Sequence, residues 1–290
     1  MGNNRLTKLC KILKSPQNVS DENVSHIFHY TYEDNKEKIT FHDKAVFLLS
    51  RIDHLLDENE GIQILEPYYH ACGALIEDEH IDKDFYKILR SVNKEDIKNT
   101  LSNTWVLCFS KNGNSNFLKR RYAAGDGWIL GINFGCLKDV CMDFPNDYGT
   151  IDLYEVKYSF KCLMRFMKTS ISKYYEFCKQ EPIDADRCKK EIVNWLSAYS
   201  FIYKNADYKQ EEEIRLVCKF DSDFLWKSED HGVQFESFVS RYNPTIKFFL
   251  DKEKLVYESQ NLEKYLDTRL NKTILSGEEI RKVLHGFNNR

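Results

Sequence analysis

Apolar residues along this chain follow two different rhythms, and the order of these rhythms predicts a mixed fold. Short runs rich in Val, Ile, Phe and Tyr are typical of β-strands, and several of them alternate between apolar and polar positions. Longer stretches with apolar residues three or four positions apart are typical of helices that bury one face. The expected strands are 27–31, 44–50, 104–110, 128–134, 151–158, 211–220, 232–240, 244–250 and 273–275. The expected helices are 62–76, 82–90, 160–179, 187–201, 261–270 and a last helix that Ser276 caps.

The order of these elements predicts an α+β fold, in which helices are inserted between strands that form mixed or antiparallel small sheets. We expect one domain over residues 1–290, because no repeat, low-complexity tract or flexible linker interrupts the pattern. Residues 1–24 are polar and predict an N-terminal arm or a short helix. Residues 51–61 predict an acidic loop or the start of a helix.

Composition narrows the class of protein. The chain has 290 residues, 42% of them hydrophobic and 14% aromatic, with only 5 Pro and 12 Gly, which favours an ordered core. A net charge of −3 provides no general attraction to nucleic acid. The nine Cys residues show no disulfide-framework spacing, and the first 20 residues do not resemble a signal peptide. We therefore expect a cytoplasmic protein, and no apolar run reaches the roughly 18 residues that span a membrane.

Two motifs suggest cofactor sites only weakly. The segment GDGWILG at 125–131 resembles the dinucleotide fingerprint, but its third Gly is one residue late and a strand is expected to follow. Cys136 and Cys141 have no second pair to complete a metal site. His26 and His29 lie three apart on an expected strand, so they should face opposite sides. The sequence therefore predicts no metal site.

The strongest candidate chemistry lies in the acidic run that precedes Arg215. If residues 211–220 form a strand, Glu211, Glu213 and Arg215 share one of its faces, and Glu212 and Ile214 share the other. Two carboxylates and a guanidinium are costly to bury without partners. The run therefore predicts either a polar site or a structural ion-pair network.

Other reactive side chains recur beside apolar runs. His29 lies on the first expected strand, Ser110 ends a middle strand, and Asp57 and Glu60 lie in the acidic loop. Each of these residues alone fits an ordinary structural role. Taken together and in this order along the chain, these residues suggest a functional site.

The order of short motifs resembles a bacterial family catalogued as domain of unknown function number twenty-nine seventy-one. The likeness covers roughly residues 27–275. The family usually has Asn-Asp in the acidic loop, where this chain has Leu56-Asp57, and a Trp shortly before Tyr122, where this chain has Phe117 and Leu118. The motifs are HYT at 29–31, Asp57 with Glu60 and Gly61, VLCFS at 106–110, RYA and WILGINF within 121–134, Tyr-Lys at 203–204, and ExExR at 211–215.

A more distant resemblance is to ADP-ribosyltransferases, which hold NAD in a cleft between two small sheets. It implies that NAD is the substrate, that Glu213 is the catalytic carboxylate and that Glu211 is its acceptor-side partner. It also implies that His29 positions NAD and that Ser110 supports Glu213. The implied NAD-binding residues are His29, Tyr30, Thr31, Ser110, Arg121, Tyr122 and Arg215. Either Arg121 or Arg215 would meet phosphate, and Arg215 could instead be a structural partner of the two carboxylates.

The resemblance leaves the acceptor open, as a protein, a nucleic acid or a small molecule. By analogy, it suggests a toxin or phage-defence effector with a regulatory or antitoxin partner. One alternative is a non-catalytic interaction module held together by an ion-pair network. Another is a metal-dependent nuclease using Asp57, Glu60, Glu211 and Glu213, which the net charge and the lack of an evident catalytic Lys disfavour.

Overall fold

The computed structural model describes most of the chain up to residue 260. The described residues are 2–16, 19, 24–40, 44–52, 55, 59–123, 127–145, 149–219, 225–228, 233–239 and 244–260. Its helices are α1 (Gly2–Ile12), α2 (Glu33–Thr40), α3 (Leu65–Glu77), α4 (Lys83–Arg90), α5 (Lys94–Leu101), α6 (Asn116–Tyr122), α7 (Phe134–Asp143), α8 (Phe160–Gln180) and α9 (Ala185–Ser200), with short 3-10 helices η3 (Ala206–Glu211) and η4 (Lys252–Lys254). Its strands are β1 (His26–Thr31), β2 (Lys44–Arg51), β3 (Thr104–Ser110), β4 (Trp128–Asn133), β5 (Thr150–Glu155), β6 (Glu213–Lys219), β7 (Leu225–Ser228), β8 (Val233–Val239), β9 (Pro244–Asp251) and β10 (Leu255–Gln260).

The ten described strands form one antiparallel sheet that branches at β3. One edge of β3 pairs along its whole length with β6, which pairs in turn with β5. The other edge is shared: β1 pairs with β3 only at Ser110, and β2 pairs only at Trp105 and Val106. From this fork, β1 continues into β4 and β10, and β2 continues into β9, β8 and β7. The predicted α+β class with antiparallel strands is therefore confirmed, but the strands form one branched sheet where several small sheets were expected.

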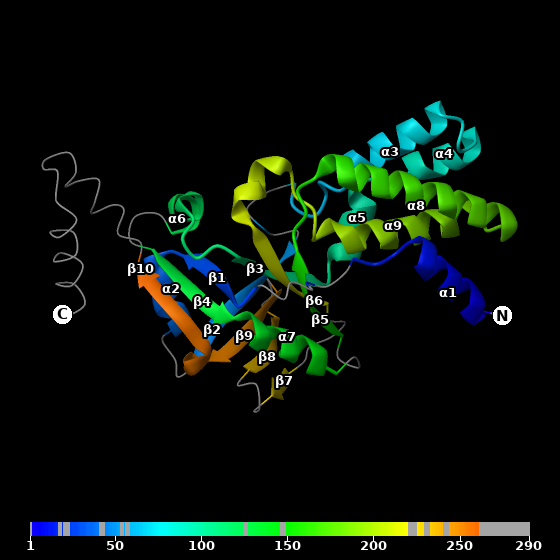
Figure 1. The fold of residues 1–290 in the computed structure, drawn as a ribbon. Coiled ribbons are helices and arrows are strands. Elements are labelled where there is room, and N and C mark those ends of the chain that lie inside the picture. The colour runs from blue at the N-terminus through cyan, green and yellow to red at the C-terminus, as the bar shows by residue number, and fades with distance from the viewer. Residues whose placement is uncertain are drawn as a thin grey trace, which may run out of the picture.

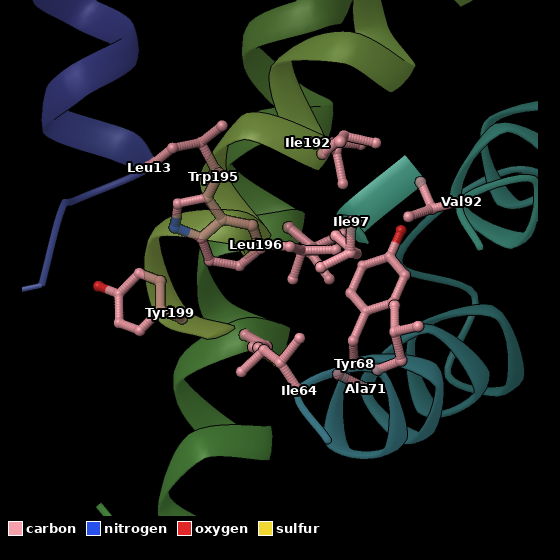
Figure 2. Close-up of a cluster of buried hydrophobic side chains, with 14 of the residues drawn as sticks. Leu13, Ile64, Tyr68, Ala71, Val92, Ile97, Ile192, Trp195, Leu196 and Tyr199 are labelled. Atoms are coloured by element: carbon pink, nitrogen blue, oxygen red, sulfur yellow. The ribbon is translucent and has the colours of Figure 1, made fainter. Parts of the chain in front are cut away.

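A helical layer lies on one side of the sheet and consists of α3, α4, α5, α8 and α9 (Figure 1). Its core is rich in aromatic and aliphatic side chains, and Tyr68 is fully buried in it (Figure 2). The Tyr68 hydroxyl donates a hydrogen bond to the Leu89 carbonyl, which satisfies its polar end inside the apolar cluster. Val106 of β3 and Val217 of β6 belong to the same cluster, so the helices cover one face of these two strands.

A second core lies on the face of β3 and β6 opposite the helical layer. Leu107 and Phe109 of β3 and Leu216 of β6 point into it, where they meet the stacked rings of Phe47 and Phe248. Helix α7 packs against this core through Phe134, Leu137, Val140 and Phe144. Because side chains alternate along a strand, Glu213 and Arg215 share the other face of β6 with Val217, beneath the helical layer.

Most long elements agree with the sequence pattern, but the start of β6 was predicted wrongly. Glu211 ends η3, and Glu212 has a left-handed backbone with φ of 45°, so the strand begins at Glu213. Alternation along one strand therefore does not relate Glu211 to Glu213. The elements that the pattern missed are α2, α5, α6, α7, β7 and β10. The expected elements at 261–270, 273–275 and after Ser276 lie outside the described residues.

The polar N-terminal segment contains helix α1, which is attached to the helical layer by charged contacts. Arg5 donates hydrogen bonds to the Glu181 carbonyl and to the Glu191 carboxylate. Among the described residues, no helix combines the length and the apolar character needed to cross a membrane.

Two Gly→Ala substitutions should change stability in opposite directions. A Cβ at Gly127 would lie 2.5 Å from the Thr31 carbonyl oxygen and 2.6 Å from the Ala123 Cα, which are backbone atoms that cannot rotate away. A Cβ at Gly73, within α3, would meet no atom within 4 Å. We expect Gly127→Ala to lower the free energy of unfolding by about 1–3 kcal/mol. Gly73→Ala should raise it by up to about 1 kcal/mol, through helix propensity. Urea unfolding of both variants checks this, and equal effects would contradict the packing described here.

Candidate functional site

Residues from distant parts of the chain line a single cavity of about 690 Å³. This volume lies within the roughly 300–1,000 Å³ typical of small-molecule sites. The cavity opens where β1, the end of β3, the start of β6, α6 and η3 meet. Its lining residues are Phe28, His29, Tyr30, Tyr32, Leu55, Asn59, Glu60, Cys108, Phe109, Ser110, Leu118, Arg121, Tyr122, Lys204, Tyr208, Glu211 and Glu213.

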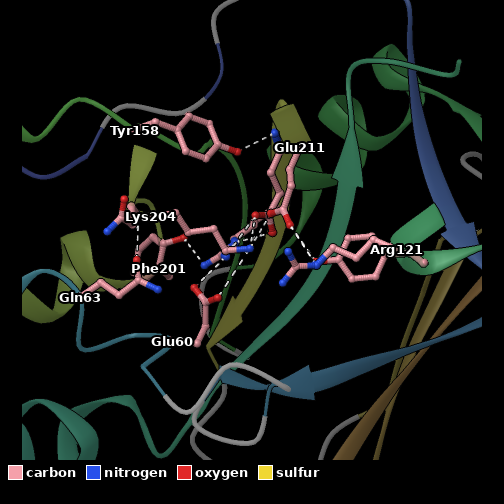
Figure 3. A network of polar contacts seen from close by, with 11 residues as sticks. Glu60, Gln63, Arg121, Tyr158, Phe201, Lys204 and Glu211 are labelled. Atoms are coloured by element: carbon pink, nitrogen blue, oxygen red, sulfur yellow. Dashed lines mark hydrogen bonds and ion pairs between the residues drawn. The ribbon is translucent and has the colours of Figure 1, made fainter. Parts of the chain in front are cut away.

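Behind the cavity wall, the guanidinium of Arg215 is fully buried and is held by three groups. Figure 3 shows the network of polar contacts in this region, with Glu60, Lys204 and Glu211 gathered near Phe201. Its Nε and Nη2 donate to the two oxygens of Glu213, at 2.7 and 3.2 Å. Nη2 also donates to Glu60 at 2.8 Å, and Nη1 donates to the Phe201 carbonyl at 2.9 Å. The Arg215 guanidinium therefore makes its hydrogen bonds inside the protein, and Arg215 does not line the cavity. This arrangement favours the structural alternative for Arg215 over a phosphate-binding role.

Lys204 lies at the point where the carboxylates converge. Its Nζ is 2.8 Å from Glu211 Oε2, 2.8 Å from Glu213 Oε2 and 3.6 Å from Glu60 Oε2. The side chain is only 8% exposed, and its position follows the end of α9, in the short segment that leads to η3. Three carboxylates and the two cations Lys204 and Arg215 thus share one buried network with one excess negative charge.

The protonation states of this network limit its chemistry. Burial alone would raise the pKa of Glu213, but the charges of Arg215 and Lys204 outweigh burial and lower it to about 2. Burial opposes the charged form of Lys204, yet the carboxylates of Glu213 and Glu60 raise its pKa above the ordinary value. At neutral pH Glu213 is therefore an ion that cannot donate a proton, and Lys204 is an ammonium that cannot act as a base.

A cysteine nucleophile is disfavoured by the same electrostatics. Burial raises the pKa of the Cys108 thiol well above its usual range, and the adjacent Glu213 raises it further. The thiolate is the reactive form of cysteine, so Cys108 is inert at neutral pH.

His29, which also lines the cavity, presents a hydrogen-bond acceptor. Its Nδ1 lies 3.0 Å from the Cys108 carbonyl oxygen, which can only accept, so Nδ1 carries the proton. Burial lowers the pKa of His29, against the opposing effect of this hydrogen bond, and favours the neutral ring. In the neutral ring, Nε2 is the acceptor. The ring also makes edge contacts with Phe47 and Phe109, which fix its orientation.

The mouth of the cavity combines a cation with aromatic rings. The Arg121 guanidinium lies 5.0 Å from the ring centre of Tyr208 and 5.5 Å from that of Tyr122. Its Nε is 4.0 Å from Glu211 Oε1, and its side chain is 43% exposed. The Tyr122 hydroxyl donates to Glu211 Oε1 at 2.7 Å, while the Tyr32 hydroxyl donates to the Arg121 carbonyl. The mouth of the cavity can therefore bind an anion and an aromatic ring side by side.

The structure brings together most of the residues that the sequence predicted. His29, Tyr30, Ser110, Arg121, Tyr122, Glu211 and Glu213 all line the cavity. Tyr30 is anchored by its hydroxyl to the Asn112 carbonyl and the Ser115 amide. Thr31 is buried where β1 pairs with β4 and does not line the cavity.

Several residues of the site were given no role in NAD binding or catalysis by the sequence. Lys204 belongs to the Tyr-Lys pair that precedes the acidic run, which was its only signal. Tyr208 lines the cavity, and the Tyr158 hydroxyl accepts the backbone N–H of Glu213. Glu60 joins the network through Arg215, whereas Asp57 lies outside the described residues.

The structure places a lysine beside the carboxylates of the nuclease alternative, but the described residues show no set of metal ligands. Lys204 lies beside Glu211 and Glu213, although the spacing along the sequence did not reveal it. Within the described ranges, no group of three or more His, Cys, Asp or Glu side chains is arranged to hold a metal ion.

Comparison with models of known protein families, with curated proteins and with solved structures returned no significant match for this chain. The resemblances to the bacterial family and to ADP-ribosyltransferases therefore remain hypotheses.

Glu213→Gln should destabilise the protein by about 3–5 kcal/mol, because it leaves Arg215 buried with one carboxylate fewer. The folded state depresses the pKa of Glu213, so its contribution is present above the unfolded value of 4.5 and disappears as pH falls toward about 2. Urea unfolding between pH 7 and pH 3 should show a shallower loss of stability on acidification in the variant. Glu212→Gln, an exposed neighbour, is the matched control and should stay within about 0.5 kcal/mol. A stable Glu213→Gln protein would show that the network is not needed for folding.

Proposed function

We propose that this protein binds NAD in the cavity and breaks its nicotinamide–ribose bond, as an ADP-ribosyltransferase-like enzyme or an NAD glycohydrolase. The observation that carries the proposal is the convergence of His29, Ser110, Glu211 and Glu213 on one cavity. These residues come from β1, from the end of β3 and from the η3–β6 segment, which lie far apart along the chain.

The charges of the cavity suit this bond cleavage. When the C–N bond breaks, its electron pair leaves with the nicotinamide nitrogen, and positive charge develops on the ribose. An ionised carboxylate beside the sugar stabilises that charge, as in glycoside hydrolysis. The ribosyl cation is then captured by a lone pair of the acceptor or of water, which loses its proton to solvent. The cavity is suited to this step, because two carboxylates, Glu211 and Glu213, line it and the pKa of Glu213 is lowered by Arg215 and Lys204, which keeps it ionised.

The walls of the cavity match the other parts of the ligand. Arg121 at the mouth can pair with the pyrophosphate through its fork. The ring of Tyr122 or Tyr30 can stack on nicotinamide, and His29 Nε2 can accept a hydrogen bond from a ribose hydroxyl. In this proposal, the sheet fork at β3 takes the place of the cleft between two small sheets expected for ADP-ribosyltransferases.

The biological setting follows only from the resemblance. An acceptor that is a protein, a nucleic acid or a small molecule, a role as toxin or phage-defence effector, and a regulatory or antitoxin partner are all part of this hypothesis. No metal is required for the proposed chemistry.

The competing proposal is a non-catalytic interaction module. The observation that favours it is the complete burial of Arg215 among internal partners, as expected of a purely structural ion-pair network. Under this alternative NAD would neither bind nor be consumed.

The direct test is incubation with NAD, followed by chromatography of released nicotinamide. We expect release by the parent protein, and an upward shift of its melting temperature when ADP-ribose is present, because a ligand that binds only the folded state stabilises it. An absence of both effects would overturn the proposal and favour the interaction module.

Arg121→Ala should weaken NAD binding about tenfold or more, because a charged hydrogen bond to phosphate contributes roughly 1.5–3 kcal/mol. The effect should appear as a raised KM in the nicotinamide-release assay. Arg120→Ala is the matched control, since Arg120 is the preceding residue of the same helix, is exposed and does not line the cavity. Equal effects of the two substitutions would remove Arg121 from the binding site.

A further inference from the structure

Glu211 and Glu213 are equally buried, yet their carboxylates are used differently. Each side chain is only 4% exposed, and both line the cavity. Exposure therefore does not decide which of the two can touch a ligand. The number of acceptor positions still available on each carboxylate does, since a carboxylate has about four such positions.

Three of the roughly four acceptor positions of Glu213 are filled by charged groups of the protein. Oε1 accepts from Arg215 Nε, and Oε2 accepts from Arg215 Nη2. The Lys204 ammonium lies 2.8 Å from Oε2. Both oxygens of Glu213 are therefore already engaged by buried cations, which limits what a ligand hydroxyl can reach.

Glu211 has fewer internal donors. Among the described residues, its Oε1 accepts one hydrogen bond, from Tyr122, and its Oε2 accepts one, from Lys204. Arg121 Nε is 4.0 Å from Oε1, which is an ion-pair distance but too long for a hydrogen bond. About two acceptor positions therefore remain on a carboxylate that the protein holds beside the aromatic mouth.

We infer that Glu211, and not Glu213, is the carboxylate that touches the ligand in this cavity. Glu213 is a structural member of the network that compensates Arg215 and holds Lys204. Lys204 in turn orients Glu211 through its bond to Oε2. In its application to NAD this inference rests on the proposed function, and it reverses the roles that the ADP-ribosyltransferase resemblance implied for the two residues.

The backbone at Glu212 provides the reason why the two carboxylates differ. Its left-handed conformation, with φ of 45°, turns the chain between η3 and β6. Glu213 therefore enters the strand, with its side chain on the face that carries Arg215, whereas Glu211 stays on η3 beside Tyr208. Had the strand begun at Glu211, strict alternation would have placed both carboxylates on the Arg215 face.

The test that needs no variant is labelling of the folded protein with a water-soluble carbodiimide and glycine ethyl ester. Cleavage after Lys209 and Arg215 yields one peptide that contains Glu211, Glu212 and Glu213, so tandem mass spectrometry compares all three in the same molecule. The exposed Glu212 is the internal positive control. We expect Glu211 to be labelled at least tenfold more than Glu213, and NAD to protect Glu211 but not Glu212.

Equal labelling of Glu211 and Glu213, stronger labelling of Glu213, or no labelling of Glu211 would overturn the inference. If NAD gives no protection and no nicotinamide is released, the proposed function fails, but the labelling ratio still decides which carboxylate is available to a ligand. The two failures are therefore distinguishable.

Two substitutions extend the test to binding. Glu211→Gln should weaken NAD binding tenfold or more, with a smaller fall in melting temperature than Glu213→Gln. Glu213→Gln, measured well below its melting temperature, should retain more NAD binding than Glu211→Gln, because Glu211 is the carboxylate with acceptor positions available to the ligand. If Glu213→Gln is folded and has lost NAD binding while Glu211→Gln keeps it, the assignment is wrong.

Discussion

The structure depends on the compensation of one buried cation, the Arg215 guanidinium. Moving such a charge out of water costs several kcal/mol even after relaxation, and only well-placed acceptors offset this cost. Glu213 supplies two acceptors from the same strand, Glu60 supplies one from the segment before α3, and the Phe201 carbonyl supplies one from the end of α9. Arg215 therefore joins strand β6 of the sheet to the segments next to α3 and α9 of the helical layer.

The same compensation determines the charges that the cavity presents. Arg215 binds Glu213 on the side away from the cavity. Lys204 can therefore lie on the cavity side, between Glu213 and Glu211. Each ion is held by neighbours of the opposite sign, so the charges are already oriented before any ligand arrives. Preorganised charges of this kind are what electrostatic catalysis requires, and their desolvation is paid for during folding.

The shape of the cavity follows from the fork in the sheet. β1 pairs with β3 only at Ser110, so the two strands diverge beyond this point and β1 offers the Cys108 carbonyl no backbone ladder partner. The ring of His29 fills this position by donating from Nδ1, which satisfies the carbonyl and fixes the tautomer. A structural requirement of the sheet thereby orients a histidine toward the ligand space.

Hydrophobic periodicity alone determined the long elements, because burial of one face imposes a period of two on strands and 3.6 on helices. Strands β3 and β9 and helices α8 and α9 lie close to their predicted positions. Helix α2 (EDNKEKIT) was missed, since its one aliphatic residue sets no period, whereas the equally short α4 (KDFYKILR) was predicted from its spaced apolar residues. The sequence also identified Glu211, Glu213, Arg215, His29 and Ser110 as candidates, because reactive residues beside apolar runs are visible without a structure.

Only the tertiary structure decided how these residues divide their roles. The order of strands in a branched sheet depends on contacts between distant segments, which a local pattern does not encode. The turn at Glu212 separates Glu211 from the strand, and the approach of Lys204 and Glu60 decides which carboxylate oxygens are filled. Residue types and their spacing could be read along the chain, but hydrogen-bond partners could not, because each partner comes from an element whose position is fixed only by packing.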